Sequence, residues 1–274
     1  MIIKDYITTE VQNVFSMLDA EEMPQMHKYL SDIMDEDGFV TASAYEIAAN
    51  LMNCDRQQAL PDFIGSFIME MFESAIEEGN ADAMNDLGAI FYDGARGFEQ
   101  SFEKALYYYN MAAENGSRQA QENLGYCYYY GRNMDKPDYE KAFHYFALGA
   151  FDGHLISLYK IGDMYLNGLY VKKNEKEAFH IYMHCLDTMT EDAAKYVAGP
   201  VHLRLGKMFL NGLGTDKNYR SALICYQKAE AFLYDMVAAG DPKYRKSLDA
   251  AIRGQAKARE LLLDELPDDE WIHD

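Results

Sequence analysis

The stretch Leu87-Gly88-Ala89-Ile90-Phe91-Tyr92-Asp93-Gly94 decides the fold, because its core recurs three more times along the chain. Each copy has an apolar residue, a glycine, an aromatic residue three positions later and a second glycine three positions after that. The other copies begin at Leu124, Ile161 and Leu205, and their first glycines are 37, 37 and 44 residues apart. Self-similarity at this interval predicts a repeat protein in which each repeat is one supersecondary unit.

Each copy predicts a pair of packed helices. Ala83, Leu87, Ile90 and Phe91 are spaced as one buried stripe of a helix. We expect the first glycine to let a second helix approach closely, and the second glycine to end the first helix in a left-handed conformation. The second helix follows a capping residue, which is Ser101, Asp138, Asn174 or Asn218. Because one hairpin cannot bury its apolar face, the pattern predicts an all-α solenoid of stacked hairpins.

The repeats divide the chain into three predicted segments. Residues 79–240 contain the four repeats, and residues 241–274 form a capping helix with a tail. Residues 1–78 form an acidic helical cap, in which 41–78 is a divergent leading repeat and 1–40 an additional helix.

Two details of these segments follow from local signals. The break at Gly240-Asp241-Pro242 precedes an amphipathic pattern that predicts a closing helix from Tyr244 to Leu266. Seven extra residues before the fourth repeat, near Thr188 to Pro200, lengthen either a helix or a loop.

The charge of the chain excludes some classes of partner. The 274 residues include 45 acidic and 25 basic ones, and residues 1–78 hold 16 acidic and only 3 basic residues. Such a balance repels phosphate backbones and anionic lipid, so we expect no nucleic-acid and no membrane partner. The chain lacks both a secretory signal pattern and a spanning apolar run, and its four cysteines form no CxxC pair. These features predict a cytoplasmic protein with reduced thiols.

The repeated residues resemble the Sel1-like repeat family, a relative of the tetratricopeptide repeats, over roughly residues 80–235. The resemblance implies a right-handed α/α superhelix in which the first helix of each repeat, helix A, lines a concave face. It also implies an adaptor or scaffold and not a catalyst, with no cofactor.

The related tetratricopeptide fold implies where a ligand would bind. There, contacts come from helix A positions five and two before the leucine of the Leu-Gly core, and two, five and six after it. Transferred to this chain, these positions give a candidate partner-binding set: Asn85, Tyr92, Asp93, Tyr126, Tyr129, Tyr130, Tyr159, Asp163, Asn167 and Asn211.

The composition of this set indicates a protein or peptide ligand. Tyrosine combines a large contact area with a hydroxyl group, as interface anchors require, and asparagine can bond a peptide backbone. Asp93 and Asp163 favour a ligand with basic character. The alternative is that several of these tyrosines simply pack between neighbouring helices.

Two patterns could suggest chemistry, and neither predicts a catalytic or metal site. Ser101-Phe-Glu-Lys104 matches the S-x-x-K of penicillin-recognising enzymes, but no S-D-N or K-T-G partner motif follows, and Ser101 aligns with a helix cap. His180 and His184 have the spacing of two metal ligands on a helix, but a third ligand is not evident.

The sequence therefore leaves a ranked set of functions. The first is a non-catalytic scaffold that binds a protein or peptide in the concave groove. The alternative is an acidic immunity-type inhibitor that masks a basic effector, and a penicillin-binding hydrolase is a distant third.

Overall fold

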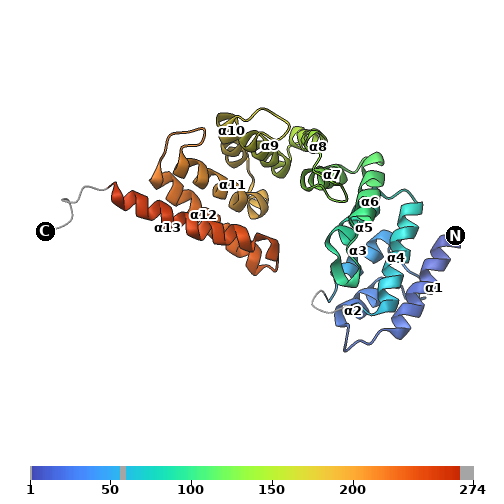
Figure 1. Cartoon of the computed structure of the whole chain (residues 1–274). Coiled ribbons are helices and arrows are strands. Elements are labelled where there is room, and N and C mark those ends of the chain that lie inside the picture. The colour runs from blue at the N-terminus through green and yellow to red at the C-terminus, as the bar shows by residue number, and fades with distance from the viewer. Residues whose placement is uncertain (1, 56–59, 266–274) are drawn as a thin grey trace, which may run out of the picture. The chain divides into compact units, whose positions relative to one another are not determined.

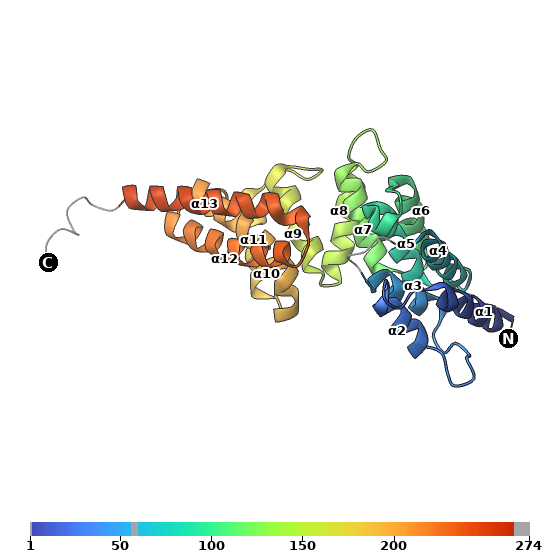
Figure 2. The same cartoon turned by 90° about the horizontal axis from the view of Figure 1, so that it is seen from below.

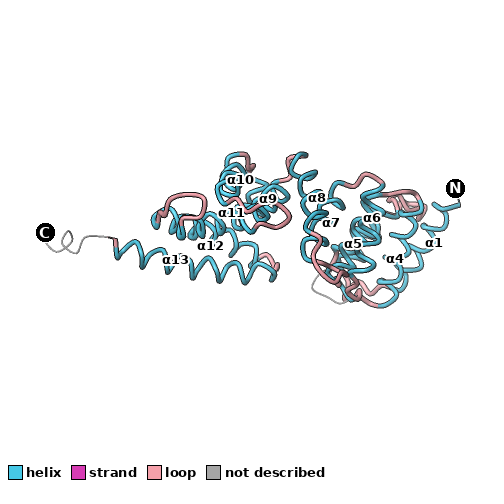
Figure 3. The backbone as a smooth tube through the Cα atoms, turned by 45° about the horizontal axis from the view of Figure 1, so that its top comes forward, coloured by secondary structure: helices cyan, strands magenta, loops and turns pink. Residues whose placement is uncertain are grey.

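The computed structural model describes residues 2–55 and 60–265, and all regular secondary structure within them is helical (Figures 1 and 3). Outside the helices, one isolated antiparallel bridge joins Met34 to Val40. The all-α class predicted from the repeats is therefore confirmed.

The chain divides into two compact units, Met1–Asp138 (unit 1) and Tyr139–Asp274 (unit 2). The division falls inside the second repeat, between its two helices, whereas the predicted segments follow the repeat pattern. Unit 1 contains α1 (Ile2–Met17), α2 (Pro24–Asp32), α3 (Ala44–Asn53), α4 (Asp62–Glu77), α5 (Ala81–Asp93), the 3-10 turn η1 (Ala95–Gly97), α6 (Phe102–Glu114) and α7 (Arg118–Tyr130). Unit 2 contains α8 (Tyr139–Phe151), α9 (Leu155–Asn167), α10 (Glu175–Asp187), α11 (Glu191–Asn211), α12 (Tyr219–Ala238), the 3-10 turn η2 (Pro242–Tyr244) and α13 (Arg245–Asp264).

The repeats appear as successive helix pairs. Helices A are α5, α7, α9 and α11, and the second helices of the repeats, helices B, are α6, α8, α10 and α12. Within unit 2, α11, α12 and α13 lie side by side in both views (Figures 1 and 2).

In three of the four cores the first glycine, Gly88, Gly162 or Gly206, lies against an aromatic ring of helix B. A Cβ atom added to Gly88 would stand 2.6 Å from Cδ1 of Tyr109, and one added to Gly162 would stand 2.6 Å from Cε1 of Tyr182. Both distances are shorter than any real Cβ contact, so only glycine permits this approach of the two helices. The close approach predicted from the sequence is thereby confirmed.

The ends of the helices follow the predicted capping pattern. Gly94 ends α5 at φ 66°, in the left-handed region that a residue with a Cβ atom rarely adopts. Ser101, Asn174 and Asn218 accept hydrogen bonds from backbone N–H groups in the first turns of α6, α10 and α12. Local residue chemistry therefore defines where these helices begin and end.

The N-terminal region contains one helix more than predicted. Residues 1–40 were expected to form a single helix, but α1 and α2 are separate, and Pro24 begins α2. Proline suits the first turn of a helix and cannot continue a preceding one, which explains the break. The leading pair predicted for 41–78 is present as α3 and α4, with Ile47 and Leu51 fully buried.

The extra residues before the fourth repeat lengthen a helix and not a loop. Helix α11 starts at Glu191 and runs for 21 residues, with Pro200 inside it. At the C-terminal end, α13 matches the predicted closing helix to within two residues at each end. The predicted tail from Pro267 lies outside the described residues.

Candidate functional site

The ten predicted binding residues differ in exposure. Four are exposed, namely Asp93, Tyr130, Asn167 and Asn211. Three are half-buried, namely Tyr92, Tyr126 and Tyr129. Three are buried, namely Asn85, Tyr159 and Asp163. The six residues from Asn85 to Tyr130 belong to unit 1 and the other four to unit 2, so each unit presents its own part of the set.

Three of the four tyrosines of α7, namely Tyr126, Tyr129 and Tyr130, form a cluster at the C-terminal end of that helix. The rings of Tyr126 and Tyr130 are stacked with their centroids 6.3 Å apart, and Tyr129 meets Tyr130 edge to face at 5.0 Å. The side chain of Tyr130 is 48% exposed. The cluster therefore keeps accessible aromatic surface and is not buried as a whole between helices.

Arg132 joins this cluster to the preceding repeat. Its guanidinium carbon lies 5.4 Å from the ring centroid of Tyr130, 5.5 Å from that of Tyr92 and 4.7 Å from that of Phe102. Arg132 Nε also donates a hydrogen bond of 3.1 Å to the Tyr92 hydroxyl. The end of α5, the start of α6 and the end of α7 thus supply three rings around one guanidinium, an arrangement that stabilises the cation of Arg132.

A chain of polar contacts connects the first helices of successive pairs in unit 1. The Tyr45 hydroxyl on α3 donates to Asp86 Oδ2 on α5 at 3.0 Å. Asn85 Nδ2 donates to Asp86 Oδ1 at 3.3 Å, and Asn123 Nδ2 on α7 donates to Asn85 Oδ1 at 3.0 Å. These bonds place Tyr45, Asn85, Asp86 and Asn123 on one side of unit 1.

The environment of Asp86 disfavours its charge. Burial raises the pKa of Asp86 above its ordinary value, and the hydrogen bonds from Tyr45 and Asn85 only partly offset this effect. Burial, together with the neighbouring carboxylate of Asp86, raises the pKa of Tyr45 to about 12, so Tyr45 stays a hydrogen-bond donor. Asp86 therefore accepts side-chain hydrogen bonds from two neutral groups, the Tyr45 hydroxyl and the Asn85 amide.

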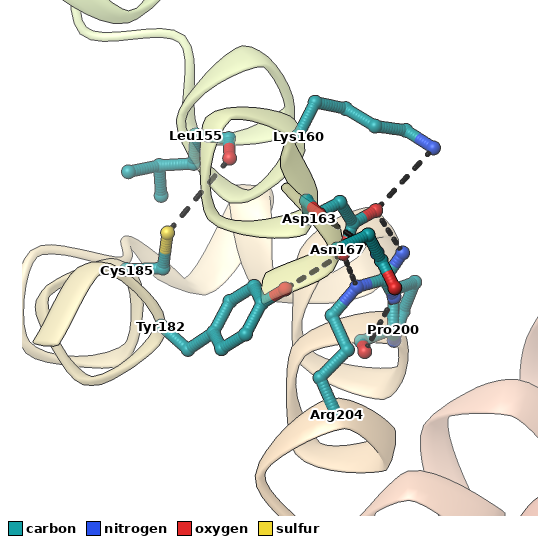
Figure 4. Close-up of polar contacts among 8 residues, drawn as sticks. All are labelled: Leu155, Lys160, Asp163, Asn167, Tyr182, Cys185, Pro200 and Arg204. Atoms are coloured by element: carbon teal, nitrogen blue, oxygen red, sulfur yellow. Dashed lines mark hydrogen bonds and ion pairs between the residues drawn. The ribbon is translucent and has the colours of Figure 1, made fainter. Parts of the chain in front are cut away.

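Unit 2 contains a carboxylate of a different kind, at Asp163 on α9 (Figure 4). Arg204 on α11 donates to both oxygens of Asp163, from Nε at 2.5 Å and from Nη2 at 2.6 Å. The Tyr182 hydroxyl on α10 donates to Oδ1 at 2.7 Å, and Lys160 Nζ lies 3.7 Å from Oδ2. Burial by itself would raise the pKa of Asp163, but Arg204 holds this pKa below its ordinary value.

Two of the predicted ligand contacts therefore lie in internal contacts with Arg204, Asp163 as its ion-pair partner and Tyr159 as a ring beside it. The sequence assigned Asp163 to a basic ligand, but Arg204 of the same unit already neutralises it. Tyr159 is 6% exposed, and its ring lies 4.7 Å from the guanidinium carbon of Arg204. Asn167 and Asn211 are exposed, and each donates to the carbonyl four residues earlier in its own helix, at 2.7 and 2.8 Å.

The transferred positions omit the residue immediately before the apolar-Gly core. This residue is Asp86, Asn123, Lys160 and Arg204 in the four repeats, and each of them takes part in the polar contacts described above. The sequence contains a signal that could have identified this position. Its residue changes from acidic in the first repeat, through neutral in the second, to basic in the third and fourth.

Of the two patterns that could suggest chemistry, the Ser101–Lys104 segment has a structural role in this fold. The backbone N–H of Lys104 donates to Ser101 Oγ, so Ser101 caps α6, and the Lys104 ammonium lies 4.7 Å from the Phe91 ring centroid. His180 and His184 are exposed on α10. In the parts of the chain that the structure describes, no three His, Cys, Asp or Glu side chains form a group that could hold a metal ion.

None of the described helices is both long and apolar enough to cross a bilayer.

Comparison with known proteins supports the repeat assignment. The family model of the Sel1 repeat matches four segments, residues 81–117, 118–154, 155–182 and 201–231. None of the curated protein sequences matches the chain.

Solved structures resemble this fold at low sequence identity. One is a protective antigen of uropathogenic Escherichia coli with an SLR fold, at TM-score 0.55 and 22% identity, matched over 84% of this chain and 49% of the antigen. The chain thus spans about half the length of that antigen. Another is a Sel1 repeat protein from Oxalobacter formigenes, at TM-score 0.53 and 21% identity, over 74% of this chain and 77% of that protein.

An immunity protein from Pseudomonas aeruginosa is more distant. It matches at TM-score 0.42 and 17% identity, over 84% of this chain and 83% of its own, and a likeness at this level supports no functional argument.

Three findings agree on the family of this chain: the four matched segments, the helix pairs that they form, and the fold shared with a solved Sel1 repeat protein. The chain belongs to the Sel1 repeat family.

Proposed function

We propose that this chain is a non-catalytic scaffold that binds a protein or peptide through the helix A side of unit 1. Sel1 repeats are generally protein-interaction modules, which is the family-level basis of the proposal. The observation that carries it is the tyrosine cluster of Tyr126, Tyr129 and Tyr130, in which Tyr130 is 48% exposed. Exposed aromatic side chains on a rigid helix are well suited to anchor a partner, because they lose little conformational entropy on binding.

The proposal extends to the other predicted positions of the helix A side. Asp93 adds an exposed carboxylate at the end of α5, and Asn167 and Asn211 add exposed amide groups in unit 2. We place the protein in the cytoplasm, because all four cysteines are free thiols and three of them are buried.

A pull-down from the native host's lysate, read by mass spectrometry, tests the proposed site. The wild-type chain is compared with a Tyr126→Ala/Tyr129→Ala/Tyr130→Ala variant. A matched control replaces three exposed tyrosines elsewhere, namely Tyr107, Tyr196 and Tyr234. We expect a protein that the wild type and the control retain and the cluster variant loses. Equal retention by all three chains would refute the site.

The charge of unit 1 favours a second candidate, in which the chain masks a basic effector as immunity-type inhibitors do. Unit 1 holds 25 acidic and 8 basic residues, a net charge of -17, whereas unit 2 holds 20 and 17, a net charge of -3. Binding by bulk charge would weaken steeply between low and physiological salt, and tyrosine-anchored binding would weaken much less. Measuring the affinity of the captured protein at both salt concentrations separates the two candidates.

A further inference from the structure

Unit 1 contains a hollow between the second helices of two successive pairs, α4 and α6. It has a volume of about 500 Å³, and residues of α4, α5, α6 and the segment that joins α5 to α6 line it. Pockets that bind small molecules have volumes of about 300–1,000 Å³. None of the described lining residues belongs to the tyrosine cluster, so the hollow is separate from the proposed partner site.

Three apolar side chains line the hollow, namely Met69 on α4, Phe91 on α5 and Phe98 in the joining segment. Phe91 is 6% exposed, and the other two are half-buried. The Phe98 ring reaches α4, because a Cβ atom added to Gly65 would stand 4.0 Å from Phe98 Cζ. An apolar group placed over these three side chains would remove their remaining surface from water, which favours binding.

The wall formed by residues 94–101 is fixed by hydrogen bonds. Gln100 Nε2 donates to the carbonyl oxygen of Tyr92 at 2.8 Å, and Arg96 Nη1 donates to the carbonyl oxygen of Cys54 at 2.6 Å. Arg96 has φ 58°, a left-handed conformation that a residue with a Cβ atom keeps only where its surroundings hold it. The hollow is therefore preformed, and a ligand need not order this segment on binding.

Two exposed side chains of opposite charge, Lys104 and Glu99, also line the hollow. The Lys104 ammonium lies 4.7 Å from the ring centroid of Phe91, so the cation stands directly beside the apolar lining. Among the described residues, neither Lys104 nor Glu99 forms an ion pair, with each other or with a third side chain. Both charges are therefore available to a ligand.

We propose that this hollow binds a small zwitterion with an apolar body, which is an apolar amino acid or dipeptide. Its carboxylate pairs with Lys104, its ammonium group pairs with Glu99, and its apolar side chains cover Met69, Phe91 and Phe98. A ligand with only a negative charge would be repelled by Glu99, and one with only a positive charge would be repelled by Lys104. This binding site goes beyond the proposed scaffold function and does not depend on it.

Titration of the full chain with the dipeptide Leu-Phe, followed by NMR, tests the inference. Two comparison ligands each lack one charge, since N-acetyl-Leu-Phe has no ammonium group and Leu-Phe amide has no carboxylate. We expect Leu-Phe to shift the backbone amide signals of residues 97–104 and to bind at least about fivefold more tightly than either comparison ligand. A parallel titration with L-phenylalanine distinguishes the two sources: equal affinity assigns the site to amino acids, and tighter binding of Leu-Phe assigns it to dipeptides.

Single variants connect each ligand charge to one side chain. Lys104→Gln should weaken the binding of Leu-Phe about fivefold and leave that of Leu-Phe amide unchanged, because the amide lacks the carboxylate. Glu99→Gln should weaken Leu-Phe and leave N-acetyl-Leu-Phe unchanged for the same reason. The control Lys28→Gln removes an exposed lysine on α2 of the same unit, and we expect less than about a twofold change. Circular dichroism and thermal melts establish that the variants are folded.

Several outcomes would overturn the inference. One is that neither Leu-Phe nor L-phenylalanine binds, or that the shifted signals lie away from the lining residues. Another is equal affinity for Leu-Phe and its two blocked forms, because the ligand charges would then not be recognised. A third is that Lys104→Gln weakens Leu-Phe amide as much as Leu-Phe, or that Lys28→Gln has the same effect as Lys104→Gln.

Discussion

Arg204 and Asp163 join two successive helices A of unit 2 through a bidentate ion pair, with Nε 2.5 Å and Nη2 2.6 Å from the two carboxylate oxygens. They lie 41 residues apart in the sequence, and Asp163 is 7% exposed. Removing either partner would leave the other charge in a poorly hydrated site, which is costly. The pair therefore makes the stability of unit 2 depend on one contact between α9 and α11.

Replacing Arg204 by alanine should destabilise unit 2 by up to about 3–5 kcal/mol, because Asp163 would remain buried with only the more distant Lys160, at 3.7 Å, as a cation. Urea denaturation followed by circular dichroism measures the change. Lys195→Ala breaks the exposed ion pair with Asp192 and should cost less than about 1 kcal/mol. A loss for Arg204→Ala as small as that of the control would contradict the assigned role of the buried pair.

The stability of the protein should fall on acidification because of His202. Burial, and to a lesser degree the charge of Lys228, lower the pKa of His202 from its ordinary 6.5 to about 4. His202 is 7% exposed and stacks on the Phe232 ring at 6.5 Å, and its Nδ1 atom has no hydrogen-bond partner among the described residues. The folded state thus favours the neutral ring.

The sign of the effect follows from proton binding. Between pH 6.5 and pH 4 the unfolded chain binds a proton at His202 that the folded chain does not, so stability decreases as the pH falls through this range. We expect a loss of about 2 kcal/mol at pH 4.5 relative to pH 7, and a smaller loss in a His202→Leu variant. Identical pH dependence of the two proteins in urea denaturation would rule out this contribution.

Two glycine-to-alanine substitutions in unit 1 should have opposite effects on stability. In Gly88→Ala the new methyl group would meet the Tyr109 ring at 2.6 Å, and separating α5 from α6 should cost about 1–3 kcal/mol. In Gly65→Ala, on α4, the methyl group would meet only Phe98 Cζ, at 4.0 Å. Alanine favours the helix there, so stability should rise by about 0.5–1 kcal/mol. A melting temperature of Gly88→Ala that does not fall would contradict the packing assigned to Gly88, and one of Gly65→Ala that falls would contradict the open environment assigned to Gly65.

Arg132 should hold the tyrosine cluster in place. In an Arg132→Ala variant the Tyr92 hydroxyl loses its donor and three rings lose their cation, so we expect a loss of about 1–2 kcal/mol. Arg132→Lys keeps the charge but not the planar stack, and its loss should be smaller. Hydrogen exchange over 119–130 should become faster in the alanine variant, and unchanged exchange would show that the cluster does not depend on Arg132.

Local patterns were enough to predict the repeat fold. The apolar-Gly cores, the N-caps and the Gly94 end of α5 each depend on residues within one or two helical turns, which a single sequence displays. The separate α1 and α2 were missed, although the signal for the break, Pro24 at the start of α2, stands in the sequence. All ten binding positions were assigned from a family resemblance. Such a resemblance gives the position of a residue along helix A, but it does not give the side chains that surround that residue in this chain.

What the sequence by itself determined is the succession of helix pairs and the strongly acidic character of unit 1. Only the tertiary structure decided which charges are neutralised within the chain. Asp163 follows and Asp86 precedes an apolar-Gly core, and nothing in either local sequence says whether a cation lies nearby. In the structure α11 brings Arg204 to Asp163, whereas Asp86 receives only Tyr45 and Asn85. The physical reason is that capping and periodicity act within a helix, whereas the environment of a carboxylate depends on side chains brought from other helices, here 19 to 41 residues away.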